Sequence, residues 1–231
     1  MSDWRCLAIE TATEQGSVAV AAGGRIYTRD LTAARNSSRE VYRVAQELLR
    51  EAAISVADLN CVACGSGPGS FTGVRVAVAA TQGLGYSLQI PVIGISTLAA
   101  LAQAAVEQGL SGYLAPCLDA RMGELYVGLY ASKAGELAAA AADDRLLAPD
   151  DLGAMAGAES VLGVGAGWEA YPLPVQANIS LMKARSVIWP TATAVLSLAE
   201  ARYRAGEYVD PAQLVPNYLR NNVAKRQRFR S

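Results

Sequence analysis

The chain has 231 residues, of which 52% are hydrophobic and 18% are charged, and its formal net charge is −1. This length suits one large domain or two small ones, and the charge gives the whole chain no strong attraction for nucleic acid or anionic membranes. The sequence contains no histidine, which excludes histidine-based acid–base catalysis, Ser-His-Asp triads and the commonest zinc and iron ligand sets.

The first half of the chain alternates apolar runs, turn residues and helical periodicity. We expect strands at Cys6–Ile9, Ser17–Ala21, Arg25–Leu31, Leu59–Cys64 and Pro91–Ile95, and helices at Ser37–Ala53, Val74–Leu88 and Leu98–Gln108. This β-β-β-α-β-α-β-α order is that of the ribonuclease-H-like unit found in sugar kinases, actin and Hsp70. We therefore predict an α/β fold with a ribonuclease-H-like N-terminal domain at residues 1–106.

From Tyr113 the pattern partly restarts. We expect strands at Tyr113–Leu118, Leu125–Tyr130 and Ser160–Val164, a loop or fraying helix at the alanine-rich Leu137–Ala142, and a helix at Thr191–Ala205. The prediction is a two-domain, actin-like ATPase architecture whose second domain, residues 107–231, is a reduced α/β unit with a basic tail.

Cys6, Cys61, Cys64 and Cys117 are the four cysteines. Within a strand, the spacing of Cys61 and Cys64 sends their side chains to opposite faces, so we expect buried free thiols and no metal or redox pair. The N-terminus lacks the charged start and apolar core of a signal peptide, and no apolar run approaches a membrane span. A cytoplasmic protein without a membrane partner is the expectation.

The glycine-rich stretch Gly65–Arg75 joins a predicted strand to a predicted helix. Such a loop can cradle an anion at the helix start or pack tightly against another backbone. It is not a P-loop, because no Lys-Ser or Lys-Thr pair follows the glycines.

The helix after this loop is apolar nearly all round, with Arg75 its only charge. Its second face is covered either by its own chain or by a partner. Under the partner interpretation, this helix and Ser37–Ala53 form a four-helix contact with the same helices of another subunit. The expected interface residues are Val41, Val44, Ala45, Leu48, Val74, Ala77, Val78 and Thr81.

Four polar residues end predicted strands where ribonuclease-H-like ATPases bind Mg²⁺ and phosphate: Glu10, Thr11, Thr13 and Asp119. The alternative is that they stabilise turns, and that Asp119 pairs with Arg121. A phosphate-binding loop usually has more glycine, together with a lysine or metal-binding carboxylates. No catalytic residue, metal or cofactor is therefore expected.

The final residues, Pro211–Ser231, contain no acidic side chain. Arg220, Lys225, Arg226 and Arg228 are the candidates for tRNA contacts through phosphate, and the alternative is a simple solvated end. We expect Pro216–Arg220 to dock on the folded body.

Five collinear motifs resemble the bacterial TsaB family over nearly the whole chain. They are Ala8–Thr13, Gly67–Arg75, Gly94–Leu98, Asp119–Tyr126 and Pro216–Val223. The resemblance implies a two-domain actin-like fold and a part in making tRNA threonylcarbamoyladenosine at position 37. It implies a non-catalytic scaffold that pairs with the transferase TsaD, recruits the ATPase TsaE, forms a homodimer when alone and reaches tRNA only through the complex. Older names group the family with glycoprotease-like peptidases.

The resemblance also locates a lost metal site. TsaD-like proteins carry an H-x-x-x-H motif on the helix after the turn that corresponds to Gly94–Ser96, which places Thr97 and Leu101 at the histidine positions. Leucine has no donor atom and a neutral hydroxyl is a poor ligand, so the sequence supports loss of that chemistry. A self-sufficient actin-like nucleotide-binding enzyme remains the alternative.

Overall fold

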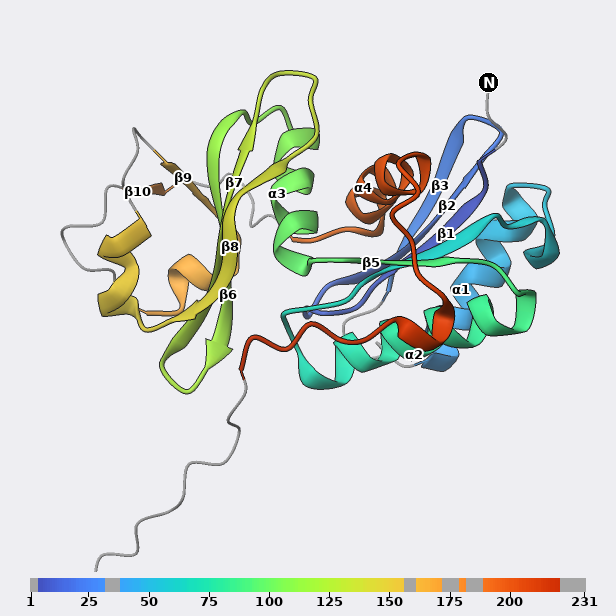
Figure 1. Cartoon of the computed structure of the whole chain (residues 1–231), viewed down its shortest axis with the longest axis horizontal. Coiled ribbons are helices and arrows are strands. Elements are labelled where there is room, and N and C mark those ends of the chain that lie inside the picture. The colour runs from blue at the N-terminus through green and yellow to red at the C-terminus, as the bar shows by residue number, and fades with distance from the viewer. Residues whose placement is uncertain (1–3, 32–37, 156–160, 172–178, 182–188, 221–231) are drawn as a thin grey trace, which may run out of the picture.

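The computed structural model describes residues 4–31, 38–155, 161–171, 179–181 and 189–220. Two five-stranded sheets lie side by side, with helices between them and on the outer face of the first sheet (Figure 1). None of the helices in these ranges has the length and apolar character needed to cross a membrane.

The first sheet has the strand order β3-β2-β1-β4-β5. Its strands are β1 (Cys6–Glu10), β2 (Gly16–Ala22), β3 (Arg25–Leu31), β4 (Cys61–Gly65) and β5 (Val92–Ile95). The first three pair antiparallel, and β4 and β5 then continue the sheet parallel to β1. This is the ribonuclease-H-like arrangement predicted from the sequence.

Side-chain alternation along the first sheet separates two kinds of packing. Leu7 and Ile9 of β1 face α1 (Ser38–Glu51) and α2 (Phe71–Leu88), whereas Cys6 and Ala8 face the opposite layer. That layer contains α3 (Thr97–Glu107) and α4 (Ala192–Arg204). The small side chains on its side of the sheet leave room for a helix to approach closely.

The cysteines follow the same alternation. Cys61 lies in the core under α4 and Cys64 in the core under α2, on opposite faces of β4. All four cysteines are free and buried, and burial raises the pKa of the Cys64 thiol to about 12. The expectation of buried core thiols is confirmed.

The second sheet has the order β10-β9-β6-β7-β8. Its strands are β6 (Gly112–Arg121), β7 (Glu124–Ser132), β8 (Ala139–Leu147), β9 (Val161–Val164) and β10 (Ile179–Leu181). β6, β7 and β8 form an antiparallel meander, and β9 and β10 add parallel strands beside β6. α3 packs on this sheet, so it joins the two halves (Figure 1).

The alanine-rich segment Leu137–Ala142, predicted as loop or fraying helix, begins as loop but enters β8 at Ala139. Ala139, Ala140 and Ala142 pair with β7, and the register shifts between Val127 and Tyr130. Alanine has the highest intrinsic helix propensity, but propensity is a weak determinant, and the hydrogen bonds offered by β7 override it.

The sequence predicted α4 as part of the second half, but this helix packs against the first sheet, where it contacts β1, β2, β4 and β5.

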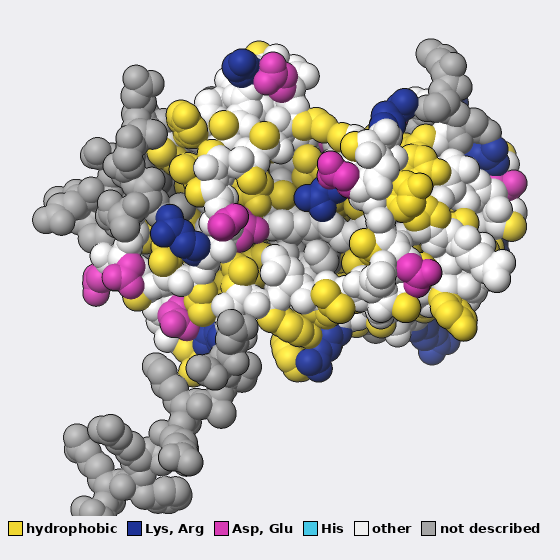
Figure 2. Space-filling model, in the orientation of Figure 1, with side chains coloured by type: hydrophobic (Ala, Val, Ile, Leu, Met, Phe, Trp, Pro, Cys, Tyr) yellow, Lys and Arg dark blue, Asp and Glu magenta, His cyan; other side chains and the backbone are white. Residues whose placement is uncertain are grey.

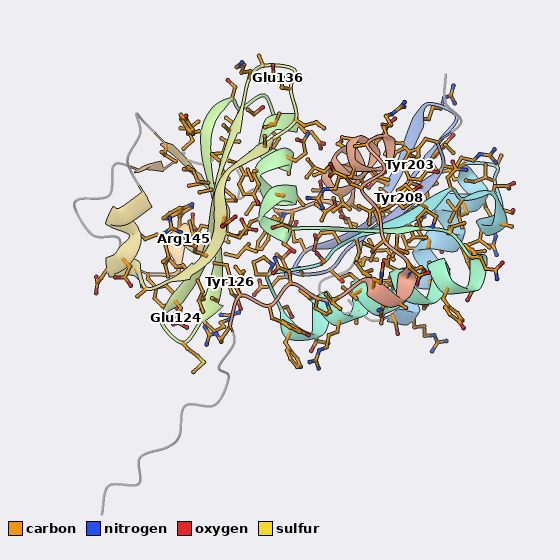
Figure 3. All side chains as sticks on the ribbon, viewed as in Figure 1. Glu124, Tyr126, Glu136, Arg145, Tyr203 and Tyr208 are labelled. Atoms are coloured by element: carbon orange, nitrogen blue, oxygen red, sulfur yellow. The ribbon has the colours of Figure 1, made fainter. Side chains whose placement is uncertain are left out.

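We call the chain after α4, residues 205–220, the C-terminal strap. It starts beside α4, where Tyr203 and Tyr208 lie together (Figure 3), and it forms an antiparallel bridge from Val209 to Val92 of β5. The strap then runs along α2, where the side chain of Gln82 donates to the Leu214 carbonyl.

Candidate functional site: the cleft between the two sheets

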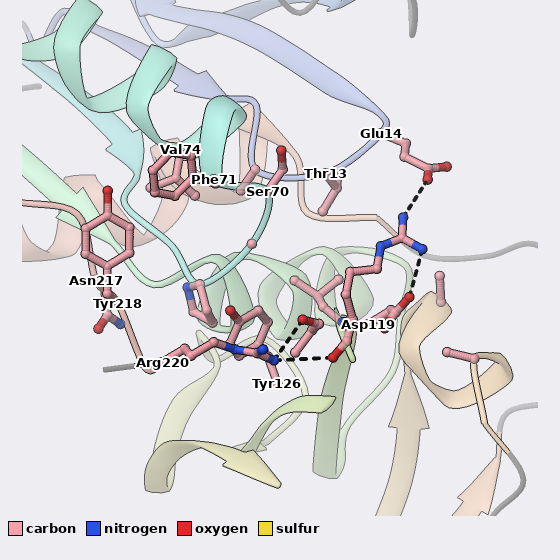
Figure 4. Close-up of a pocket in the computed structure, with 18 of the residues that line it drawn as sticks. Thr13, Glu14, Ser70, Phe71, Val74, Asp119, Tyr126, Asn217, Tyr218 and Arg220 are labelled. Carbon is pink, nitrogen blue, oxygen red and sulfur yellow. Dashed lines mark hydrogen bonds and ion pairs between the residues drawn. The ribbon is translucent and has the colours of Figure 1, made fainter. Parts of the chain in front are cut away.

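The two halves enclose a cleft of about 960 Å³ whose walls come from segments far apart in the sequence (Figure 4). The β1–β2 turn, Ala12–Glu14, and the start of α2 form one wall. The end of β6 and the last residues of the C-terminal strap form the other. Of the four polar candidates, Thr13 and Asp119 line this cleft, whereas Glu10 and Thr11 are buried behind it.

Glu10 is fully buried at the end of β1. Its Oε1 accepts a hydrogen bond from the backbone N–H of Ala12 at 2.7 Å. Its Oε2 lies so close to the backbone of Gly65 that a Cβ atom there would be only 1.8 Å away. Burial raises the pKa of Glu10 to about 7, against the opposing effect of the backbone N–H groups of Ala12 and Thr11.

The rest of the β1–β2 turn is held against the glycine-rich loop. The Thr11 hydroxyl donates to the Gly73 carbonyl at 2.7 Å, and the Ala12 carbonyl accepts from the Ser70 N–H at 2.7 Å. Gly69 lies against Ala12 with no room for a side chain. Of the two alternatives for this loop, the close packing of two backbones is therefore what the structure contains.

The carboxylate of Asp119 is held by other residues of the second half of the chain. Its Oδ1 accepts hydrogen bonds from the Arg121 N–H at 2.7 Å and from the Tyr171 hydroxyl at 3.1 Å, and its Oδ2 pairs with the Arg121 guanidinium at 3.0 Å. Arg121 reaches across the cleft to Glu14 at 3.6 Å (Figure 4). The Thr11 and Asp119 oxygens are thus engaged with protein groups. Glu10 lies buried behind the cleft, with its Oε2 unpaired there, so this set does not fit a Mg²⁺–nucleotide.

The two positions at which the resemblance places metal-binding histidines are also inaccessible to a ligand. Thr97 and Leu101 are fully buried in α3. Within the described ranges, no group of three or more His, Cys, Asp or Glu side chains is placed to hold a metal ion.

The eight predicted interface residues require a correction. Val41, Val44, Ala45, Leu48, Val74, Ala77, Val78 and Thr81 are all between 0% and 4% exposed within the single chain. All but Thr81 belong to the apolar core between the first sheet and the pair α1 and α2, and Thr81 is a buried polar residue. The sheet covers more of each helix than the apolar pattern suggested, because large side chains of β1, β2 and β4 all face this layer.

A different face of α2 remains at the surface. It carries small residues, Ala79 and Gly83, and ends at Tyr86, which is 77% exposed. Tyr42 of α1 is also exposed and lies beside Gly83, with its hydroxyl 3.6 Å from where a Cβ atom would be. We call Tyr42, Ala79, Gly83 and Tyr86 the outer α2 face.

Arg220, a predicted tRNA contact, is instead a structural residue. Its guanidinium donates to the carbonyls of Ala120 and Arg121 (Figure 4). It also pairs with Glu124 at 2.6 Å, and its side chain is only 14% exposed. Docking of Pro216–Arg220 on the body is confirmed, since the Asn217 N–H also donates to the Ser66 carbonyl. Lys225, Arg226 and Arg228 lie outside the described residues.

Replacing Arg220 with alanine is expected to release the end of the strap from the β6–β7 turn. The change removes charge-assisted hydrogen bonds from a mostly buried group, and we expect a loss of about 2 kcal/mol in the free energy of unfolding. The amide of Asn217 should also exchange faster in hydrogen-exchange mass spectrometry. Arg204→Ala is the matched control, because Arg204 pairs with Glu200 on the same exposed helix face and such pairs contribute little. Equal protection of Asn217 in both variants would contradict this role of Arg220.

The sequence analysis did not select one cluster that the structure brings together at the edge of the cleft. Arg75 of α2 lies over the ring of Phe71, with 3.5 Å between its guanidinium carbon and the ring centroid, and its Nε donates to the Tyr218 hydroxyl at 2.8 Å. We call Phe71, Arg75 and Tyr218 the Arg75 cluster. These residues belong to two separate sequence motifs, and no local pattern indicates that the motifs touch.

Comparison with known proteins gives consistent matches over the chain. A family model described as "TsaD: tRNA N6-adenosine threonylcarbamoyltransferase" matches residues 28–228. The tRNA threonylcarbamoyladenosine biosynthesis protein TsaB of Escherichia coli K12 is 33% identical over 224 residues, which cover 95% of this chain and 96% of that protein. The Haemophilus influenzae protein of the same name is 30% identical over 230 residues, covering 96% of each. The solved structure of YeaZ from Pseudomonas aeruginosa superimposes with a TM-score of 0.84 at 33% identity, covering 94% of this chain and 100% of that one.

Proposed function

Since the chain belongs to the TsaB family of tRNA threonylcarbamoyladenosine biosynthesis proteins, we propose that it is the non-catalytic subunit that supports a TsaD-type threonylcarbamoyltransferase. Its part in tRNA threonylcarbamoyladenosine biosynthesis follows from the family. The scaffold role, the pairing with TsaD and the recruitment of a TsaE-type ATPase are our proposal, as are homodimer formation when the subunit is alone and a place in the cytoplasm.

One observation carries the non-catalytic assignment: the polar groups at the two strand ends are either engaged by protein groups or buried behind the cleft. Thr11 donates to Gly73, Glu10 is buried, and Asp119 is held by Arg121 and Tyr171. A group that must reorganise before it meets a substrate is a poor catalyst, because catalysis depends on donors and acceptors already aimed at the reacting atoms. The partner's active site would then supply the chemistry.

The outer α2 face supports the pairing. Small residues allow two helices to approach closely, and an exposed tyrosine such as Tyr86 supplies contact area with little loss of side-chain entropy. This face replaces the buried residues first predicted for the interface. We propose that it packs against the equivalent helices of the TsaD-type subunit, and against a second copy of this chain when that subunit is missing.

Introducing a charge on this face is expected to prevent assembly without affecting the fold. In Ala79→Glu, a carboxylate would be trapped between two closely packed helices, and we expect the affinity for the TsaD-type subunit of the same organism to fall by about 100-fold or more. Ala201→Glu is the matched control, since Ala201 is an exposed alanine on α4, on the other side of the first sheet. Sedimentation of the mixed subunits measures the complex, and urea unfolding checks that both variants keep their stability. Normal assembly of Ala79→Glu would reject the proposed face.

A self-sufficient nucleotide-binding enzyme is the second candidate, favoured by the size of the cleft alone. Titration calorimetry of the isolated chain with ATP and Mg²⁺ separates the two. We expect no saturable heat in the micromolar range and no phosphate release. Saturable binding that is lost in Asp119→Asn would favour the enzyme.

A further inference from the structure

The Arg75 cluster holds a guanidinium group in one orientation at the surface. One face of the Arg75 guanidinium lies on the Phe71 ring. The Tyr218 ring stacks beside the Phe71 ring, with 6.3 Å between the two ring centroids. Since the Nε of Arg75 is used by the Tyr218 hydroxyl, both terminal nitrogens of the guanidinium remain available. A guanidinium fixed in this way has lost its rotational freedom before it meets a ligand, and its planar fork matches a carboxylate.

The charge of Arg75 is not balanced within the part of the chain that the structure describes. Its guanidinium contacts Phe71 and Tyr218, and neither of these is a carboxylate. The other two arginines at the cleft differ, because Arg121 pairs with Asp119 and Glu14, and Arg220 pairs with Glu124. Of these three, Arg75 is the one without a carboxylate partner among the described residues, so another molecule can supply one.

The surroundings of Arg75 are apolar and exposed. Phe71 is 58% exposed, Tyr218 is 45% exposed, and Val215 of the strap is also open to solvent. Figure 2 shows hydrophobic side chains and basic groups together on the surface over the end of α2 nearest the cleft. Arginine and large aromatic residues in such a setting are the types that dominate the energy of protein interfaces.

We propose that the Arg75 cluster is a docking anchor that receives a carboxylate of the TsaD-type subunit, flanked by apolar side chains of that subunit. The inference rests on the proposed function, and it names a contact that the outer α2 face alone does not provide. The cluster lies at the N-terminal end of α2 and the outer α2 face runs toward its C-terminal end, so one partner surface along the helix covers both.

A protein carboxylate fits this site better than an RNA phosphate. The residues that line the cleft include three basic and three acidic side chains, so their formal charges cancel: Arg75, Arg121 and Arg220 against Glu14, Asp119 and Glu169. A neutral wall does not attract a polyanion. The exposed apolar rings, in contrast, gain from being covered by a protein surface.

The test compares Arg75→Ala with Arg25→Ala, which removes the same charge from the exposed first residue of β3. The probe is the TsaD-type subunit of the same organism, and surface plasmon resonance measures the dissociation constant from 50 to 500 mM NaCl. We expect Arg75→Ala to weaken binding by about 30-fold and to reduce its salt dependence. Arg75→Lys should restore little of the affinity, because lysine has the charge without the planar fork.

Two further variants keep the outcomes distinct. Tyr218→Phe removes the hydrogen bond between the strap and the Nε of Arg75 but keeps the aromatic ring. If Tyr218→Phe loses less affinity than Arg75→Ala, the effect of Arg75→Ala is not explained by a loosened strap. If Ala79→Glu abolishes binding while Arg75→Ala binds like the unaltered chain, the anchor is overturned and the proposed function stands. If Ala79→Glu binds normally, the proposed interface fails. If Arg75→Ala assembles normally but the complex then binds tRNA more weakly, the ligand of Arg75 is a phosphate and the carboxylate assignment is wrong.

Discussion

Replacing Gly73 with alanine is expected to destabilise the chain by about 3 kcal/mol or more, a large part of the stability of a typical domain. A Cβ atom at this position would lie 1.9 Å from the backbone carbonyl oxygen of Thr11. Backbone cannot rotate away as a flexible side chain can, and the Thr11 hydroxyl bond to the Gly73 carbonyl fixes the same two segments. The helix start and the end of β1 must therefore separate.

Gly83→Ala is the matched control on the same helix. The nearest atom to its added Cβ is the Tyr42 hydroxyl at 3.6 Å, which is an ordinary contact. Alanine is favoured over glycine in a helix, so we expect this variant to gain about 0.5–1 kcal/mol. Urea unfolding followed by circular dichroism measures both. A Gly73→Ala protein as stable as the unaltered chain would show that the contact between β1 and α2 is not tight.

Replacing Glu10 with glutamine is expected to stabilise the protein at neutral and alkaline pH. The folded-state pKa of Glu10 is about 7, raised from 4.5 by burial, so the folded state binds this proton more tightly than the unfolded state. The contribution of Glu10 to stability is therefore highest below pH 4.5, falls as the pH rises from 4.5 to 7, and is lost above 7. The difference corresponds to about 3 kcal/mol, as an upper bound.

Glutamine is neutral throughout this range, and its carbonyl oxygen can keep the hydrogen bond from the Ala12 N–H. Glu10→Gln and the unaltered chain should be similar in stability at pH 5, and the variant should be the more stable at pH 8. The measurement is the urea unfolding free energy between pH 5 and 8.5. Glu136→Gln removes the same charge from the exposed β7–β8 turn (Figure 3) and should leave the pH profile unchanged. Parallel profiles for Glu10→Gln and the unaltered chain would mean that Glu10 is charged or solvated in the folded state.

Much of the fold could be predicted from local patterns. The apolar runs of β1, β2, β4 and β5 and the periodicity of α1 to α4 predict elements that the structure contains, with small shifts at the ends. The opposite facing of Cys61 and Cys64 follows from strand geometry alone. The docking of Pro216–Arg220 also agrees with expectation.

The site was less predictable, because a local pattern identifies apolar side chains but not what covers them. The sequence pattern is compatible with Leu48 and Val78 in either the core or an interface, and the structure places both in the core. A glutamate at either position would therefore test the fold and not the interface. Arg220 was predicted to be a free cation because its partner, Glu124, is distant in the sequence.

The sequence by itself determined the α/β class, the order of the elements in the first half and the absence of histidine chemistry, since composition and periodicity are properties of neighbouring residues. Only the tertiary structure decided that α4 returns to the first sheet, that the β1–β2 turn closes on Gly73, and that Arg75 meets Tyr218. These contacts join residues between 62 and 175 positions apart. Their free energy depends on burial and on geometry that exist only after the chain has folded, and no local pattern encodes them.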